Sequence, residues 1–235
     1  MQNGHHKIYK NIYFDLDNTL WDFHSNSKQT LTDLIDKHVP QLKPRLTEFL
    51  TLFYEINDRL WLQYRNGELP KVVLRNKRFS DTLKLMGIDD GELAKKFGDD
   101  YINESPYKTI LFPNTLETLE YLKGKGYRMF LLTNGFLEVQ VIKIRESKLE
   151  PFFEKMITSE EAGYQKPHQK IFEHALKTVN AKKAESIMIG DDLDNDIFGA
   201  KRFGMDTVFF NPQKIAHTSQ PTYEISGLEE LRMFL

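Results

Sequence analysis

The chain has 235 residues, with 32 Lys and Arg against 34 Asp and Glu, so its formal net charge is −2. A near-neutral chain is not expected to bind polymeric nucleic acid, because such binders need a basic surplus. The chain contains no cysteine, which excludes disulfides, thiolate metal sites, iron–sulfur clusters and a cysteine nucleophile. Its length is typical of one large domain, or of a core with an insertion.

The sequence shows no apolar segment typical of a membrane span or a secretory signal. No apolar run approaches the ~18–20 residues that span a bilayer, and the residues before Asp15 contain no apolar signal core. We therefore expect no membrane partner, no secretory peptide and a cytoplasmic location. His5 and His6 are interpreted as part of a surface end rather than a metal site.

The first expected elements are one strand and a long helical stretch. Ile8–Phe14 is apolar and β-rich and predicts a strand. Residues 26–103 follow a helical pattern, and one helix face is formed by Leu46, Phe49, Leu50, Phe53, Ile56 and Leu60. Further helices are expected around Leu74–Met86, ending near Gly87, and over Glu92–Tyr101.

After Pro106 the pattern alternates between helices and strands. Asn114 is expected to cap a helix that stops at Gly124. Strands are then predicted at Tyr127–Leu132, Lys155–Thr158, Ser186–Ile189, Thr207–Phe210 and Tyr223–Ile225, with helices at Leu137–Ser147, His168–Val179, Asp194–Phe203 and the C-terminus. This alternation predicts an α/β fold with a parallel sheet between helices. The domain prediction is a discontinuous α/β core of residues 1–21 and 107–235, interrupted by an all-α domain of residues 22–106.

Polar and charged residues follow four of these apolar segments. They are Asp15 and Asp17, then Thr133 and Asn134, then Lys166, and finally Asp191, Asp192 and Asp196. Because ligands of such sheets collect at the carboxyl edge of the strands, we expect these side chains to form one site. Asp194 is interpreted as a helix cap rather than a ligand.

The residue types at these positions are suited to phosphoryl chemistry. Crowded carboxylates repel one another unless a cation joins them, and Mg²⁺ prefers oxygen ligands and a substrate phosphate. Asp15 can then act as a nucleophile, and Asp17 as a general acid and later as a base. Lys166 supplies a positive charge, while Thr133 and the amides after it can hold phosphate oxygens. Asp191, with Asp196, would complete the metal site.

The order DxDxT, a strand-end Thr, a Lys and GDxxxxD resembles the haloacid dehalogenase (HAD) superfamily of phosphohydrolases. The resemblance implies a Rossmann-like core, a Mg²⁺ cofactor and an aspartyl-phosphate intermediate. It also implies metal ligands from the Asp15 carboxylate, the Asp17 carbonyl and the Asp191 carboxylate. It places Thr133, Asn134 and Lys166 on the phosphoryl group, and it makes the inserted helices a C1-type cap.

Several segments further resemble the YjjG-type pyrimidine 5′-nucleotidases of that superfamily. They are Leu60–Gly67, Arg78–Phe79, Leu132–Phe136, Ser159–Gly163 and Pro221–Tyr223. This resemblance implies a nucleoside 5′-monophosphate substrate, with Trp61, Tyr64 and Arg78 as candidate cap contacts. Asp192 departs from the pattern, since Ser or Thr is expected there, so Asp192 and Asp196 are kept as a possible additional acidic site.

Three other functions compete with this one. A phosphosugar mutase or phosphatase resembling β-phosphoglucomutase would use the same core residues. A 2-haloacid dehalogenase would need no metal, and Asp17 and the acidic fourth motif argue against it. A non-catalytic binding protein on the same scaffold is disfavoured because the set of motif residues is complete.

Overall fold

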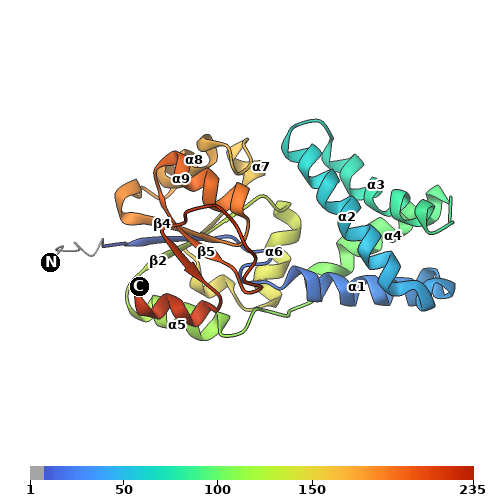
Figure 1. The fold of residues 1–235 in the computed structure, drawn as a ribbon, viewed down its shortest axis with the longest axis horizontal. Helices are drawn as coiled ribbons and strands as arrows, with labels where there is room; N and C mark the ends of the chain where they lie inside the picture. Colours follow the sequence, from blue (N-terminus) through green and yellow to red (C-terminus); the bar gives the residue numbers. More distant parts are fainter. Residues whose placement is uncertain (1–7) are drawn as a thin grey trace. The chain divides into compact units, whose positions relative to one another are not determined.

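The structure is a computed structural model that describes residues 8–235 of the chain (Figure 1). His5 and His6 lie outside the described residues. The chain divides into two compact units: the first ends at Phe23 and resumes at Thr109–Leu235, and the second is His24–Lys108. The sequence predicts the two domain boundaries after Trp21 and after Pro106. The assignment of the two units as core and cap domains stays a prediction. Among residues 8–235, no helix is long and apolar enough to cross a membrane.

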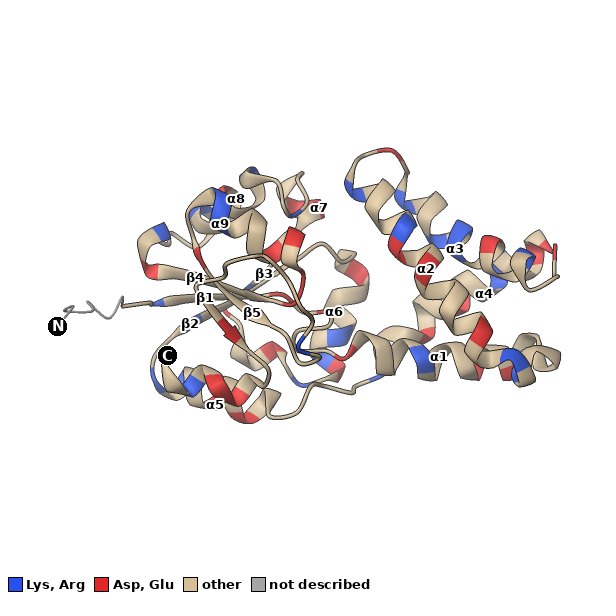
Figure 2. Ribbon diagram, in the orientation of Figure 1, with Lys and Arg blue, Asp and Glu red and all other residues tan. Residues whose placement is uncertain are grey.

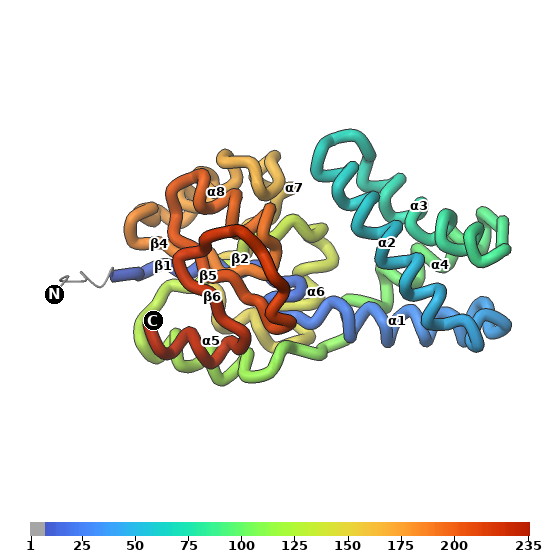
Figure 3. Tube along the Cα trace, in the orientation of Figure 1, coloured from blue at the N-terminus to red at the C-terminus, as the bar shows by residue number. Residues whose placement is uncertain are grey.

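The first unit is built on a six-stranded sheet in the order β3-β2-β1-β4-β5-β6, in which each neighbouring pair is parallel. The strands are β1 (Asn11–Phe14), β2 (Arg128–Thr133), β3 (Lys155–Thr158), β4 (Ser186–Gly190), β5 (Asp206–Phe210) and β6 (Tyr223–Ile225). The predicted α/β fold with a parallel sheet is therefore confirmed. Figure 3 shows that the chain leaves the sheet after the blue strand β1 and returns to it in the yellow-green to red part of the sequence.

Both faces of this sheet are buried, which explains why its central strands are continuous apolar runs. Successive side chains of a strand point to opposite faces. Ile12 and Phe14 of β1 thus join one apolar cluster with Leu131, while Tyr13 joins the other with Phe130. Helices α5 and α6 with the 3-10 helix η6 contribute to the first cluster, and α8 and α9 contribute to the second.

The helical segments of this unit depart from the prediction in a few places. They are α5 (Thr115–Gly124), α6 (Leu137–Glu146), η3 (Glu150–Phe152), α7 (Ser159–Ala162), α8 (Gln169–Thr178), η4 (Lys183–Glu185), η5 (Leu193–Phe198), α9 (Gly199–Phe203) and η6 (Leu228–Met233). Helix α7 was not predicted. The helix expected over Asp194–Phe203 is divided into the π-helical segment η5 and helix α9, and the C-terminal helix is a 3-10 helix.

Of the two predicted helix caps, Asn114 has the predicted N-cap position but no capping side chain, and Asp194 is not the cap residue. Asn114 precedes α5, but it has a φ of 61° and makes no side-chain cap; its amide donates to Glu229 instead. The cap of η5 is Asp192, whose carboxylate accepts from the backbone N–H groups of Asp194 and Asn195. Asp194 itself is exposed and lies in the first turn. An Asp therefore does cap this segment, but two residues earlier than expected.

The second unit is entirely helical in the part of the chain that the structure describes. Its helical segments are α1 (Phe23–His38), η1 (Pro40–Arg45), α2 (Leu46–Arg65), α3 (Lys71–Leu85), α4 (Gly91–Glu104) and η2 (Ser105–Tyr107). The first residue of α1, Phe23, still belongs to the first unit. The core of the second unit is aromatic: Phe79 lies with its ring centroid 5.3 Å from that of Phe53 and 5.4 Å from that of Phe97. Figure 2 shows basic and acidic positions along the helices of both units, as the net charge of −2 suggests.

Candidate active site

The strand order brings the predicted motif residues to one edge of the sheet. β1 lies between β2 and β4, and all three strands run in the same direction. Asp15 follows β1, Thr133 is the last residue of β2, and Asp191 follows β4. The N–H of Asp15 also donates to the carbonyl of Ile189 at 2.9 Å, which continues the β1–β4 ladder to the site.

Lys166 joins the acidic residues into one cluster. Its buried ammonium donates to Asp15 Oδ1 at 2.8 Å and to Asp196 Oδ1 at 2.6 Å. A third bond, to the carbonyl of Leu132 at 2.8 Å, ties it to the end of β2. The predicted proximity of Lys166 to the aspartates is thus present, and all three hydrogen atoms of the ammonium have an acceptor.

The electrostatics of this cluster are dominated by burial. Burial raises the pKa of the Asp15 carboxyl, although the charge of Lys166 opposes this. Burial, and then the neighbouring carboxylates of Asp15 and Asp196, raises the pKa of Asp191 well above its ordinary value. Burial alone would lower the pKa of Lys166, but Asp15 and Asp196 outweigh it and raise this pKa, so the lysine stays charged. One ammonium is thus shared by Asp15 and Asp196, and the third carboxyl, Asp191, lies in the same cluster without a bond to it.

The donor set of this cluster fits a hard divalent cation. Asp15, Asp191 and Asp196 each offer a carboxylate oxygen, and these oxygens lie within 4.8 Å of one another. Among residues 8–235, the side-chain donors that reach Asp15 and Asp191 end on Oδ1 of each, from Lys166 and Thr19 respectively. Carboxylate oxygens of this kind suit Mg²⁺.

Asp196 and Asp192 are more fully engaged by the protein. Asp196 Oδ1 accepts from Lys166, and its Oδ2 accepts from the N–H of Asp192 at 3.2 Å. Asp192 uses its carboxylate to cap η5 and also accepts from the side-chain amide of Asn195. Asp196 therefore lies in the cluster and holds the lysine, whereas Asp192 organises the backbone beside it.

Thr133 and Asn134 lie beside the cluster, and they are held in different ways. The hydroxyl oxygen of Thr133 accepts from the N–H of Gly135 at 3.0 Å and from Gln140 Nε2 at 2.8 Å, so its own proton is available to a ligand. The side chain of Asn134 donates to the Lys166 carbonyl at 3.0 Å and accepts from the Lys166 N–H at 2.8 Å. Its side chain thus positions Lys166, and contact with a phosphate would fall to its backbone.

Two residues near Asp17 were not predicted from the sequence. Lys143 donates to Asp17 Oδ1 at 2.5 Å, and Gln140 donates to Asp17 Oδ2 at 2.8 Å. Both belong to α6, a predicted helix to which no site residue was assigned from the sequence. The available signal was their spacing of three residues, which places them on one helix face directly after the Thr133 motif.

The three candidate contacts in the helical unit differ in exposure. Trp61 and Tyr64 are partly buried on α2, with their ring centroids 5.6 Å apart. Arg78 is only 4% exposed; it donates to Asn57 at 3.2 Å and lies over the ring of Tyr101. Their role as substrate contacts stays a prediction.

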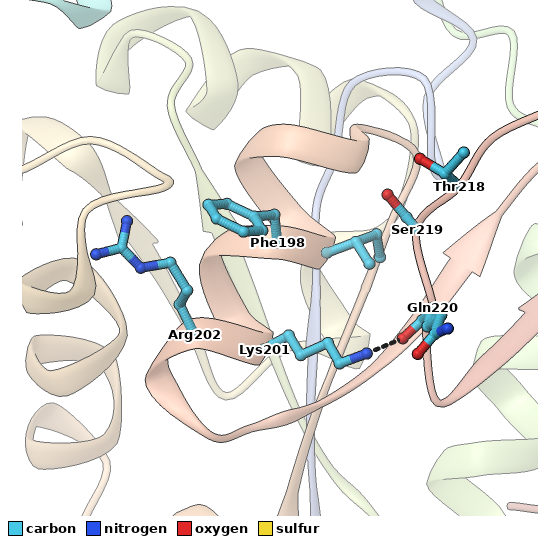
Figure 4. Close-up of a pocket in the computed structure, with 7 residues that line it drawn as sticks. Phe198, Lys201, Arg202, Thr218, Ser219 and Gln220 are labelled. Carbon is cyan, nitrogen blue, oxygen red and sulfur yellow. Dashed lines mark hydrogen bonds between the residues drawn. The ribbon is translucent and has the colours of Figure 1, made fainter.

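A surface pocket of about 420 Å³ lies in the first unit beside η5 and α9 (Figure 4). It is lined by Ile197, Phe198, Lys201, Arg202, Thr218, Ser219 and Gln220. Lys201 donates to the carbonyl of Gln220 across it, as Figure 4 shows. Its lining contains none of the predicted site residues.

A parallel sheet with buried aspartates and a lysine at its carboxyl edge defines a class of hydrolases, and the sequence comparison agrees. Residues 9–204 match the haloacid dehalogenase-like hydrolase family. This chain therefore belongs to that family and is an enzyme of the hydrolase class.

Individual relatives cover nearly the whole chain. The HAD-hydrolase YfnB of Bacillus subtilis is 31% identical over 230 residues, which is 96% of this chain and 94% of that protein. The pyrimidine 5′-nucleotidase YjjG of Escherichia coli is 29% identical over 95% of this chain and 96% of its own. A glyceraldehyde 3-phosphate phosphatase of Methanothermobacter thermautotrophicus is 28% identical over 94% of this chain and 93% of its own.

The solved structure of YfnB, described as bound to magnesium, superposes on this chain with a TM-score of 0.88. The two chains are 28% identical in that superposition, which covers 97% of this chain and 98% of the other. The predicted HAD fold is therefore confirmed.

Proposed function

We propose that this chain is a Mg²⁺-dependent phosphomonoesterase that hydrolyses nucleoside 5′-monophosphates through an aspartyl-phosphate. The observation that carries the proposal is the ammonium of Lys166, which is bonded to both Asp15 and Asp196 at the edge of the sheet where Asp191 also lies. A lysine held in this way favours the ionised form of the nucleophile and adds a fixed positive charge for the phosphoryl oxygens.

In the first step, a carboxylate oxygen of Asp15 attacks phosphorus and forms a P–O bond to the enzyme. The bond between phosphorus and the leaving oxygen breaks, and that oxygen takes a proton from the carboxyl of Asp17. The hydroxyl of Thr133, the backbone after it and Lys166 hold the phosphoryl oxygens in this step. The alcohol, a nucleoside in the proposed reaction, then leaves.

In the second step, water attacks the same phosphorus. Asp17, now a carboxylate, takes a proton from this water. The P–O bond to Asp15 breaks, which releases inorganic phosphate and restores the Asp15 carboxylate. Asp17 ends the cycle protonated and is ready for another substrate, so the proton balance closes.

Asp15 and Asp191 would hold Mg²⁺ through their carboxylates, together with the backbone carbonyl of Asp17. When bound, the cation neutralises negative charge that the phosphate and the three carboxylates bring together. Asp196 would serve the site by fixing Lys166 rather than as a direct ligand, because both of its oxygens already accept hydrogen bonds.

The nature of the leaving group is supported by similarity and by the residues of the helical unit. The pyrimidine 5′-nucleotidase activity in the name of YjjG favours a nucleotide, and the rings of Trp61 and Tyr64 are of the kind that stack on a base. The similarity to a glyceraldehyde 3-phosphate phosphatase favours a second candidate, a small phosphosugar, with the same core chemistry.

The test is a phosphate-release screen of the purified protein with Mg²⁺ across nucleoside 5′-monophosphates, phosphosugars and 2-phosphoglycolate. We expect the highest kcat/KM with a pyrimidine nucleotide. Asp15→Asn should reduce turnover by more than about a thousandfold, because the nucleophile is lost at nearly constant volume. Asp194→Asn is the matched control and should keep full activity, since Asp194 is exposed and lies outside the cluster.

A preference for phosphosugars would replace the nucleotide assignment and keep the mechanism. Full activity of Asp15→Asn would remove the mechanism as well. If no ester in the screen releases phosphate, the competing hypothesis of a non-catalytic binding protein would be favoured.

A further inference from the structure

Helix α6 buries two polar side chains, Gln140 and Lys143, and exposes two apolar ones, although its Ile144 packs in the apolar core. Gln140 is 0% exposed and Lys143 is 4% exposed, whereas Leu137 and Val141 are 46% and 43% exposed. An α/β helix normally turns its apolar face to the sheet, and burying an ammonium is unfavourable unless it is paired. The inverted pattern therefore requires strong partners for Gln140 and Lys143 inside the unit.

Those partners meet on Asp17. Lys143 Nζ donates to one carboxylate oxygen of Asp17, and Gln140 Nε2 donates to the other. A carboxylate with a donor on each oxygen is fixed both in position and in rotation about its last bond. Neither donor comes from the Lys166 cluster, so Asp17 has a separate support from α6.

The ammonium of Lys143 is itself fixed by two aromatic rings. Its Nζ lies 4.0 Å from the ring centroid of Trp21 and 6.0 Å from that of Phe23. Trp21 is fully buried, so its ring shields the ammonium from water and attracts its charge. The two rings thus restrict the position of the Lys143 ammonium while it donates to Asp17.

Gln140 connects this support to the phosphate-binding residue. The same Nε2 that donates to Asp17 also donates to Thr133 Oγ1 at 2.8 Å. Gly135 makes room for it, because a Cβ at position 135 would collide with the Gln140 amide group. The glycine of the Thr133–Gly135 segment therefore leaves space for a side chain of this chain, not only for a ligand.

We propose that Lys143 and Gln140 are positioning residues that hold the Asp17 carboxylate in place for the two proton transfers, with Lys143 the more important of the two. The inference rests on the proposed function, because Asp17 transfers protons only in that mechanism. Lys143 acts through Asp17 and has no contact with the phosphoryl group in this role.

The test uses p-nitrophenyl phosphate, because its leaving group departs without a proton donor. In stopped-flow measurements the first step appears as a burst of p-nitrophenolate, and the steady state reports the second step. For Lys143→Met, we expect the burst to slow by less than about threefold and the steady state to slow by about 100-fold, as is typical of an impaired general base. Phosphoenzyme should accumulate, and mass spectrometry of the quenched protein detects it.

Conservative replacement and a matched lysine serve as controls. Lys143→Arg keeps a cation that can donate to Asp17 and should recover at least ~10-fold of the loss, since both side chains donate to carboxylates. Gln140→Leu should show the same pattern with a smaller loss. Lys148→Met changes an exposed lysine beyond the end of α6 and should match the wild type in both phases.

The outcomes separate the inference from the proposed function. If the burst rate and the steady-state rate fall equally in Lys143→Met and Lys143→Arg restores neither, Lys143 has a structural role. That result would overturn the inference. Wild-type rates in Lys143→Met would overturn it too, while leaving the phosphatase assignment intact. A wild-type protein that releases no p-nitrophenolate with Mg²⁺ would overturn both.

Discussion

Gly190 ends strand β4 and leaves room for the carboxylate of Asp196. A Cβ at position 190 would overlap the Asp196 side chain, which cannot move without releasing Lys166. Glycine is therefore required at position 190 because the Asp196 side chain lies against its Cα, and not because of its backbone conformation.

Gly190→Ala should lower both stability and activity. Overpacking a buried site of this kind typically costs about 1–3 kcal/mol of unfolding free energy, and displacement of Asp196 should also reduce kcat. Urea unfolding and phosphate release measure the two effects. Gly124→Ala is the control: a Cβ there meets nothing within 4 Å, so this change in α5 should leave both unchanged or slightly raise stability. Equal behaviour of the two variants would contradict this account of Gly190.

At the residue scale, the acidic positions and Lys166 could be predicted, and the residues that hold Asp17 could not. Asp15 and Asp191 follow apolar runs, which made their meeting at one edge predictable. Gln140 and Lys143 are typical of an exposed helix face, because side-chain type alone predicts solvent for a Gln and a Lys. Only the partners on Asp17 reveal why they are buried.

The 3-10 helix η6 shows how a short element is held in place. Glu230 Oε1 accepts from the N–H of Gly227 at 2.8 Å and from the N–H of Ser226 at 2.9 Å. These backbone donors keep the pKa of Glu230 below its ordinary value. The element packs through Leu228 and Leu231, which belong to the apolar core on one face of the sheet.

Glu230→Ala should therefore destabilise the protein by ~0.5–2 kcal/mol at pH 7, the usual cost of a lost cap. Because the folded pKa lies below the unfolded one, the carboxylate contributes stability above the unfolded pKa, and the contribution falls as the pH drops through the folded pKa. The difference between wild type and variant in urea unfolding should thus shrink below about pH 4. Exposed Glu120→Ala in α5 should show no such difference, and a pH-independent gap for Glu230→Ala would contradict this explanation.

Element types were predictable where the apolar pattern is long and regular. The strands around Asp15 and Thr133 and the helix of Leu46–Arg65 are examples. Segment η5 was not, because its geometry depends on Asp192 capping two N–H groups while the side chain of Asp196 accepts from Asp192 N. A periodic pattern contains no information about such side-chain to backbone competition.

For the molecule as a whole, the three carboxylates around one lysine predict that Mg²⁺ stabilises the fold as well as supporting catalysis. After EDTA treatment, turnover should disappear, and adding Mg²⁺ should restore it. At about 100 times its dissociation constant, Mg²⁺ should raise the Tm by ~5–10 °C, since it binds only the folded chain. Differential scanning calorimetry measures this shift independently of activity.

Asp191→Asn should remove most of that Tm shift, because it deletes a proposed ligand. Asp194→Asn should retain it. Undiminished turnover in excess EDTA, or the same Tm shift in both variants, would show that the cluster does not bind the cation.

The sequence by itself determined the α/β core, the helical insertion and the edge at which Asp15, Thr133 and Asp191 meet. It did so because parallel strands place their carboxyl ends together, whatever the length of chain between them. The cytoplasmic location also came from the sequence, and it stays a prediction.

Only the tertiary structure decided which atoms Lys166 contacts and which side chains hold Asp17. Lys166 reaches Asp15 across 151 positions of the sequence, and Lys143 reaches Asp17 across 126. Helical periodicity shows which residues share a face, but it assigns the apolar face to the core. A buried polar face, such as that of α6, is stable only when distant partners satisfy it, and those partners exist only in the folded chain.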